Sequence, residues 1–359
     1  MKMPSYPSWE QTLAGKHWRT VHFPRIREDT PTFLGVPYAL DESDLQGADV
    51  VIIGAPFAAG WGKKYSGVDK AEWLAATTRV RQQSIRYRGG YVQELDIDVF
   101  EHLKVVDYGD IPIPLEASYE GTVERILAAQ DMVEERVRQA LDAGAIPIVI
   151  GQNSPVASYA VGRPVAQHFK GPIGMVSLDT HWDAWPYDWA TKNDRIAGST
   201  NWKDKLFRDC QNYGMQNLVE IGERGMLEDP ATVRRFVNGG CCFMPMWKIR
   251  TELGIEGVIR NLDQAYRGTD AVYAHFDMDV LGGAGPTDGD ILGELAEPMG
   301  MTDYEAIRIA YETGKRGCAG LSFLCIPPGS AVMYRVIVYC LTYFMAGIAE
   351  RKRGQNGGA

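Results

Sequence analysis

The sequence has only six cysteines among 359 residues, and no two of them form a CxxC pair. Several of them, such as Cys325 and Cys340, lie in apolar segments typical of strands or helices. A buried cysteine usually behaves as a small apolar residue, and disulfides are rare in the reducing cytoplasm. We therefore expect reduced, buried thiols and a cytoplasmic protein.

Long hydrophobic runs are also missing. The longest, residues 336–349, has 14 residues between Arg335 and Glu350, whereas a membrane-spanning helix needs about 20. This run suits a buried helix, although some of its apolar surface could instead serve a subunit interface. Residues 1–12 lack the apolar stretch of a secretory signal. We expect neither a signal peptide nor a membrane partner.

Positive charge is outnumbered, because 37 Lys and Arg stand against 46 Asp and Glu and give a formal net charge of −9. An acidic protein is poorly suited to bind nucleic acid or an anionic membrane, and it suits a cationic substrate. Internal repeats and low-complexity segments are absent. With 45% hydrophobic residues, the chain has the composition of a globular protein with a sizeable core.

The sequence does contain a regular alternation of apolar runs and helical stretches. Several runs, including IPIVI at 146–150 and AVYAHFD at 271–277, are continuous, as is typical of parallel strands buried on both faces. Strands are predicted at residues 50–54, 103–107, 146–151, 174–179, 217–222, 241–245, 271–277 and 320–326. Helices are predicted at about residues 121–143, 155–168, 255–266, 304–313 and 332–350.

This alternation predicts an α/β fold, a three-layer αβα sandwich with a central, mostly parallel eight-stranded sheet. We expect a single domain over residues 1–359, with an N-terminal extension at about residues 1–45 and a flexible tail at about residues 351–359. Open parallel sheets bind ligands at the carboxyl ends of their strands. The residues that close each strand are therefore the functional candidates.

One candidate is the run SLDTHWD at residues 177–183, which leaves a predicted strand as Asp-x-His-x-Asp. Side chains two apart in extended backbone point the same way, so Asp179, His181 and Asp183 can converge. Two carboxylates and an imidazole suit Mn, Ni, Co, Fe or Zn. The alternative for an isolated motif is structural, with Asp179 capping the following turn and Asp183 in solvent.

A second pair of carboxylates, Asp277 and Asp279, follows the apolar strand in AHFDMDV. Aspartate is common in turns, so this pair alone is weak evidence. Two aligned carboxylates after a buried strand would repel one another, and a bound cation relieves the repulsion. Together the two segments indicate a metal site at one edge of the sheet.

Seven segments, in order along the chain, resemble the ureohydrolase family, which includes arginase and agmatinase. They are GAPF at 54–57, VVDYGDIP at 105–112, IPIVIGQNSP at 146–155, SLDTHWDAW at 177–185, LVEIGERG at 218–225, HFDMDVL at 275–281 and EPMGMT at 297–302. The resemblance implies hydrolysis of a guanidinium carbon–nitrogen bond at a site of two divalent ions. It also implies five metal ligands: Asp179, His181, Asp183, Asp277 and Asp279. All but Asp183 would form the complete set for one ion.

The chain departs from the family on the metal side. Where the family has Gly-Gly-Asp-His, this chain has GQNS, which puts Ser154 at the histidine, or Asn153 if the alignment slips by one residue. Neither side chain matches an imidazole as a ligand for a borderline cation. We therefore expect at most one tightly held ion, Ni or Mn, and a strand end that is only a packed turn.

It also departs on the substrate side. Cys325 stands where the family has the glutamate that holds the guanidinium, and a cysteine cannot replace a bidentate anion. Ala197 stands at a family histidine, and Gly282-Gly283 replace an Asp-Pro pair. No catalytic residue is assigned in this chain, and its own active site is expected to be impaired.

Two features have competing interpretations. Cys325 could be a nucleophile, but its apolar segment has no histidine nearby and favours a buried structural thiol. The aromatic residues Trp182, Trp185, Tyr187 and Trp189 could stack on an alkylated cation. Such clusters more often pack a loop or an interface, which we favour.

The sequence leaves three functions open. The first is a non-catalytic or weakly catalytic subunit that assembles with an intact paralogous subunit in a trimer or hexamer. In this respect the chain resembles the degenerate partner in nickel-dependent, two-chain ureohydrolases, with metformin hydrolysis to guanylurea and dimethylamine as the expected reaction. The second is a self-sufficient ureohydrolase with one metal ion. The third is a small-molecule binding or scaffold protein without hydrolase activity.

Overall fold

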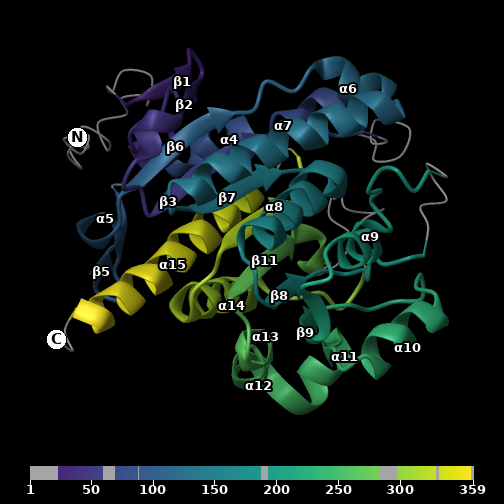
Figure 1. Ribbon diagram of the computed structural model, residues 1–359. Helices are drawn as coiled ribbons and strands as arrows, with labels where there is room; N and C mark the ends of the chain where they lie inside the picture. Colours follow the sequence, from purple (N-terminus) through teal and green to yellow (C-terminus); the bar gives the residue numbers. More distant parts are fainter. Residues whose placement is uncertain are drawn as a thin grey trace.

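A computed structural model describes residues 23–59, 69–87, 89–186, 193–282, 297–328 and 331–356. Its centre is a sheet of eight strands in the order β10-β9-β8-β11-β12-β7-β3-β6 (Figure 1). All neighbouring strands in it are parallel. The strands are β3 Val50–Ala55, β6 Val105–Asp110, β7 Ile146–Gly151, β8 Ile173–Leu178, β9 Tyr213–Ile221, β10 Cys242–Met244, β11 Ala271–Asp277 and β12 Gly320–Leu324. The predicted fold class is confirmed, and each predicted strand is present close to its expected position.

Short elements and helices fill the rest of the described chain. The short strands are β1 Arg25–Arg27, β2 Thr30–Pro31, β4 Tyr91–Val92 and β5 Ile97–Asp98. The α-helices are α3 Lys70–Leu74, α4 Ala76–Ser84, α5 Val99–His102, α6 Leu115–Glu120, α7 Val123–Asp142, α8 Ala160–His168, α9 Trp202–Asp209, α10 Pro230–Asn238, α11 Met246–Lys248, α12 Gly254–Asn261, α13 Asp263–Tyr266, α14 Asp303–Arg316 and α15 Ala331–Asn356. Single 3-10 turns lie at Phe33–Gly35, Glu42–Leu45 and Met278–Val280, and π turns lie at Pro155–Tyr159 and Ile249–Leu253.

Helices cover both faces of the sheet and make three layers (Figure 1). Side chains alternate between the faces of a strand, and β3 shows the result. Its Val50 and Ile52 belong to the hydrophobic core under α4, α14 and α15. Its Val51 and Ile53 belong to the opposite core, under α7, α8 and α9. Burial on both faces explains why the predicted strands are apolar without interruption.

The last helix, α15, is long and apolar enough to resemble a membrane-spanning helix, but 61% of its most apolar window is buried inside the chain. It packs closely on α14. A Cβ atom on Gly347 would lie 2.2 Å from the carbonyl oxygen of Tyr311, so only glycine permits this approach. The helix continues to Asn356, so residues 351–356 of the expected flexible tail are helical.

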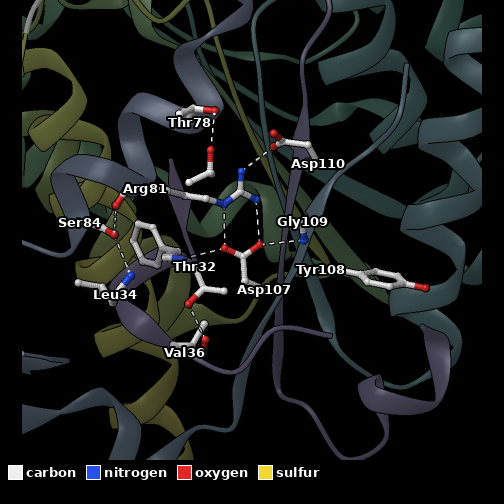
Figure 2. A network of polar contacts seen from close by, with 12 residues as sticks. Thr32, Leu34, Val36, Thr78, Arg81, Ser84, Asp107, Tyr108, Gly109 and Asp110 are labelled. Carbon is white, nitrogen blue, oxygen red and sulfur yellow. Dashed lines mark hydrogen bonds and ion pairs between the residues drawn. The ribbon is translucent and has the colours of Figure 1, made fainter. Parts of the chain in front are cut away.

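A buried ion-pair network closes the β6 edge of the sheet (Figure 2). Arg81 of α4 donates from Nε and Nη2 to the two oxygens of Asp107, at 2.8 and 2.9 Å, and from Nη1 to Asp110, at 2.6 Å. The backbone N–H of Phe33 donates to the same Asp107 carboxylate at 2.8 Å. A Cβ on Gly54 would lie 1.9 Å from Asp110. GAPF and VVDYGDIP therefore serve the fold at this edge.

The strand order also positions the functional candidates. Strands β8, β11, β12 and β7 are consecutive neighbours in the sheet. Because they are parallel, their carboxyl ends meet at one edge. The segments that follow them begin at Asp179, Met278, Cys325 and Gln152. Four of the segments singled out in the sequence therefore converge there.

Candidate metal centre

Three carboxylates and one imidazole lie together where β8 and β11 end. The Nδ1 atom of His181 is 3.2 Å from Oδ2 of Asp279. Ligand atoms of Asp179, His181 and Asp279 lie within 4.8 Å of one another. Asp277 lies next to this group, because ligand atoms of Asp179, His275 and Asp277 are also within 4.8 Å of one another. The structure thus brings together the four residues that the resemblance implies for one ion.

Two of the three aspartates in the cluster, Asp179 and Asp277, also hold their own turns. Oδ1 of Asp179 accepts from the backbone N–H of His181 at 2.8 Å, and Oδ1 of Asp277 accepts from that of Asp279 at 3.0 Å. Asp179 is 1% exposed, yet its Oδ2 atom has no hydrogen-bond partner. The capping and metal-binding interpretations are therefore compatible, since Oδ1 holds the turn while Oδ2 is left without a hydrogen-bond partner.

The electrostatics of the cluster favour a cation. Burial, together with neighbouring carboxylates, raises the pKa of Asp179 and of Asp277 well above the usual range. Burial opposes the charge of His181, but Asp279 outweighs it and raises the pKa of the imidazole to about 9. A divalent cation would offset this repulsion and satisfy Oδ2 of Asp179. Carboxylate and imidazole donors suit Mn, Ni or Zn, so these residues fit such an ion.

Asp183 lies beside the cluster and is held differently. Its backbone has a φ of 48°, in the left-handed region that non-glycine residues rarely adopt. Its Oδ2 accepts from the indole N–H of Trp202 at 3.0 Å. Burial raises its pKa to about 7. Asp183 is thus half-buried, and it is not among the metal-donor groups formed by the described residues.

The end of β7 is a packed, hydrogen-bonded turn. Gln152 is fully buried; its Nε2 donates to the carbonyls of Trp73 and Ile326, at 3.1 and 2.8 Å, and its Oε1 accepts from the N–H of Ile326 at 2.7 Å. Asn153 donates to the hydroxyl of Ser199 at 3.2 Å. Ser154 is 2% exposed and directly precedes the π turn at Pro155–Tyr159. The residues that directly follow β7, 152–155, include no histidine.

Cys325 lies against the carboxylates. Ligand atoms of Cys325, Asp277 and Asp279 lie within 4.8 Å of one another. The residue is 5% exposed and has a φ of 51°. Burial and the charge of Asp277 raise the pKa of its thiol well above the usual value, which disfavours the thiolate that a nucleophile requires. Ala197, which stands at a family histidine position, is fully buried.

Sequence reasoning missed a charged pair beneath the site. Lys203 and Glu220 are fully buried, with Nζ 2.6 Å from Oε1. Burial opposes the charge of Lys203, but Glu220 and Asp179 outweigh it and raise its pKa. The lysine therefore brings positive charge to the inner side of the carboxylate cluster. Isolated charged residues in a helix and a strand look solvated in sequence, so no signal indicated this pair.

His275 was also not singled out, although one of its nitrogens lies near Asp179 and Asp277. Both ring nitrogens have hydroxyl partners, at 3.3 Å in Ser177 and at 3.0 Å in Ser158. Burial lowers its pKa well below the usual value, so the ring is neutral. These bonds make His275 a structural residue beneath the site.

The remaining segments hold the surrounding loops. The guanidinium of Arg224, in LVEIGERG, donates to the carbonyls of Gly222, Asp279 and Glu297, at 3.1, 3.2 and 2.9 Å. It thereby ties the EPMGMT segment to the end of β11. Trp182 is 1% exposed and packs on Phe236 and Phe243, as the structural interpretation predicts. Tyr187 and Trp189 lie outside the described residues.

Comparisons with known proteins identify the family of this chain. The Arginase family profile matches residues 48–328. An agmatinase from Chromobacterium violaceum is 24% identical over 294 residues, covering 79% of this chain and 78% of the relative. Proclavaminate amidino hydrolase from Streptomyces clavuligerus has a similar structure, with a TM-score of 0.72, 20% identity, and 93% and 99% of the two chains covered. A Trypanosoma cruzi formiminoglutamase solved with Mn²⁺ has a TM-score of 0.69 and 24% identity, with 90% and 100% covered. Because the family profile matches well over half of its length, the chain belongs to the arginase family.

Proposed function

We propose that this chain is a non-catalytic or weakly catalytic, metal-binding subunit of a mixed ureohydrolase. The assembly hydrolyses the carbon–nitrogen bond of a guanidine or biguanide, with metformin, giving guanylurea and dimethylamine, as the leading substrate. Family membership supports the reaction type, since the relatives' names are those of amidino and guanidino hydrolases. Nickel or manganese is the proposed ion, and at most one is held in this chain.

One observation supports the subunit role: metal donors are present after β8 and β11, but the family's metal-binding histidine is replaced after β7. Asp179, His181, Asp277 and Asp279 supply a cluster at the ends of β8 and β11. At the end of β7, Gln152 is committed to three hydrogen bonds with backbone groups. That arrangement supports a single ion far better than a pair.

The substrate side supports the same proposal. A bound divalent ion would supply Lewis acidity, but the chain must also hold a planar cation and move a proton. Cys325 has a single sulfur atom where the family has a carboxylate, so it cannot pair in a bidentate way with a guanidinium. Ala197 offers no group that exchanges protons. A supporting subunit can hold an ion without binding the guanidinium or moving a proton. An intact sister subunit would provide the residues for both tasks.

The test is to express the chain alone and together with an intact paralogue, and to measure amine release from metformin and from agmatine. The chain alone should release no amine at a useful rate, and the mixed oligomer should be active. Elemental analysis of the isolated chain should find no more than one equivalent of divalent metal. Two equivalents would contradict the one-ion proposal.

The subunit role is tested with Asp277→Ala in this chain within the mixed complex. Turnover should persist, whereas the same change at the corresponding aspartate of the paralogue should abolish it. Asp131→Ala, on the exposed surface of α7, is the control for handling of the complex. If Asp277→Ala abolishes turnover while assembly and the paralogue's metal stay normal, the chemistry passes through this chain and the proposal is wrong. Amine release by the isolated, metal-loaded chain would instead support a self-sufficient hydrolase.

A further inference from the structure

Two departures from the family pattern, Gln152 and Cys325, are joined in the structure. The carbonyl of Gln152 accepts from the N–H of Cys325 at 3.1 Å. The side chain of Gln152 bonds both backbone groups of the next residue, Ile326, at 2.7 and 2.8 Å. Gln152 therefore fixes the backbone on both sides of the Cys325 side chain, in a conformation with a φ of 51°.

This anchored thiol faces the metal-binding carboxylates. In the sheet register Asp277 is paired with Leu324, the residue before Cys325. The sulfur and one oxygen each of Asp277 and Asp279 lie within 4.8 Å of one another. Asp279 belongs also to the group with Asp179 and His181. The two groups therefore form one continuous set of donors.

An independent observation points to a ligand in this set. Asp179 is 1% exposed and its Oδ2 atom has no hydrogen-bond partner. A buried carboxylate oxygen without a partner is costly. The same residue contributes donors near His181 and Asp279 on one side and near Asp277 on the other. A cation between these groups would satisfy it.

We propose that Cys325 is a ligand of the divalent ion in this chain, where its sulfur adds a fifth protein donor to the site. This inference rests on the proposed metal binding and adds a ligand that the family resemblance does not imply. When the ion binds, the S–H bond breaks, a sulfur–metal bond forms, and the proton leaves to solvent. No oxidant or reductant takes part.

The added thiolate has two consequences. It shifts the preference of a carboxylate-rich site from Mn towards the softer Ni, Co or Zn. It also brings the protein donors to five, and sites closed by protein ligands are typical of structural ions, whereas catalytic ions keep a position open. Both consequences agree with a subunit that holds an ion without turning over substrate.

The test uses the metal-free full-length chain titrated with Co²⁺, which reports binding and ligand type separately. Visible d–d absorption reports binding, and a near-ultraviolet thiolate-to-cobalt charge-transfer band reports a sulfur ligand. The wild-type chain should show both. Cys325→Ser should lose the charge-transfer band and bind Co²⁺ at least about tenfold more weakly. Cys340→Ala, which removes a fully buried thiol from α15, should leave both signals unchanged.

The outcomes separate the two proposals. Visible absorption without a charge-transfer band, or a band that persists in Cys325→Ser, would refute the cysteine ligand and leave metal binding intact. Absence of any Co²⁺ or Ni²⁺ binding would refute the metal site itself. Circular dichroism checks that Cys325→Ser folds. X-ray absorption of the nickel-loaded wild-type chain needs no variant and should show a sulfur neighbour at about 2.3 Å, by analogy with zinc–thiolate bonds. A shell of only nitrogen and oxygen would overturn the inference.

Discussion

At the scale of single residues, the two oxygens of a carboxylate let one aspartate make two different interactions. Asp179 and Asp277 each hold a turn with Oδ1, and Asp107 accepts from Arg81 and from backbone N–H groups together. A sequence motif cannot show how the oxygens are divided. Both oxygens of Asp107 accept from Arg81, whereas Oδ2 of Asp179 has no partner, and this distinguishes the ion-pair network around Arg81 from the Asp179–Asp279 cluster.

The first prediction concerns Arg81, which is fully buried against Asp107 and Asp110. Arg81→Met should lower the free energy of unfolding near neutral pH by about 3–5 kcal/mol, because buried Asp107 would lose its guanidinium partner and Asp110 would keep its pair with Arg27 alone. Urea unfolding monitored by circular dichroism measures this. Arg125→Met, which breaks an exposed pair with Glu120, should cost less than about 1 kcal/mol. A similar small loss for Arg81→Met would contradict the network's role.

The same network predicts a pH dependence. Burial alone would raise the pKa of Asp110, but Arg81 and Arg27 outweigh it and lower the pKa below its usual value. A carboxyl group with a lowered folded-state pKa stabilises the fold above its unfolded pKa, about 3.9, and this contribution is lost as the pH falls through the folded value. The difference between wild type and Arg81→Met should therefore shrink below about pH 4. A constant difference down to pH 2 would be the contrary result.

At the scale of elements, the segment after β7 holds neighbouring backbone in place, where the family has a metal-binding motif. Gln152 ties β7 to the segment after β12 and to the end of α3 through Trp73. The family's paired glycines have no side chain that could make these bonds. The tie also explains why Cys325 can keep its φ of 51° in a buried position.

We therefore predict that Gln152→Ala lowers the free energy of unfolding by about 1–3 kcal/mol, because buried backbone groups of Trp73 and Ile326 lose their partners. Alkylation of Cys325 by iodoacetamide, followed by peptide mass spectrometry, should also become faster as its anchor is removed. Gln211→Ala, which removes an exposed side chain bonded to the carbonyl of Arg208, should change neither value. Unchanged alkylation of Cys325 would show that other contacts hold the thiol.

At the scale of the whole molecule, large apolar side chains remain exposed at the carboxyl end of the sheet. Met226 follows β9 and is 98% exposed, and Trp247 follows β10 and is 69% exposed. By contrast, the central apolar residues of α15, such as Val338, Leu341 and Phe344, are buried within the chain. We therefore propose the subunit interface at the segments after β9 and β10, which carry Met226 and Trp247.

We accordingly expect the isolated chain to self-associate, and Trp247→Glu to shift it towards the monomer, because a charge in an apolar interface must lose its hydration. Size-exclusion chromatography with light scattering measures the shift. Leu40→Glu, at a residue 76% exposed on the β6 side, should leave the oligomer intact. If Trp247→Glu assembles like the wild type, the interface lies elsewhere on the surface.

The eight strands, the fold class and the clustered aspartates with His181 could all be predicted from the sequence. These follow from local signals, since short continuous apolar runs between turn residues are typical of buried parallel strands. The replacement of the family histidine by Asn153 or Ser154 could also be seen in the sequence, because the family motif around it is short and contiguous.

Which strand ends are neighbours could not be predicted in this way, because it depends on how the folded chain orders its strands. The surroundings of each candidate residue depend on the same order. Gln152 and Ile326 are 174 residues apart in sequence. No local sequence pattern therefore predicted that Gln152 anchors the backbone around Cys325. The buried pair of Lys203 and Glu220 has the same origin, because a charge can be buried only where another element supplies its partner. Contacts between distant segments, rather than residue types, set the chemistry available at this site.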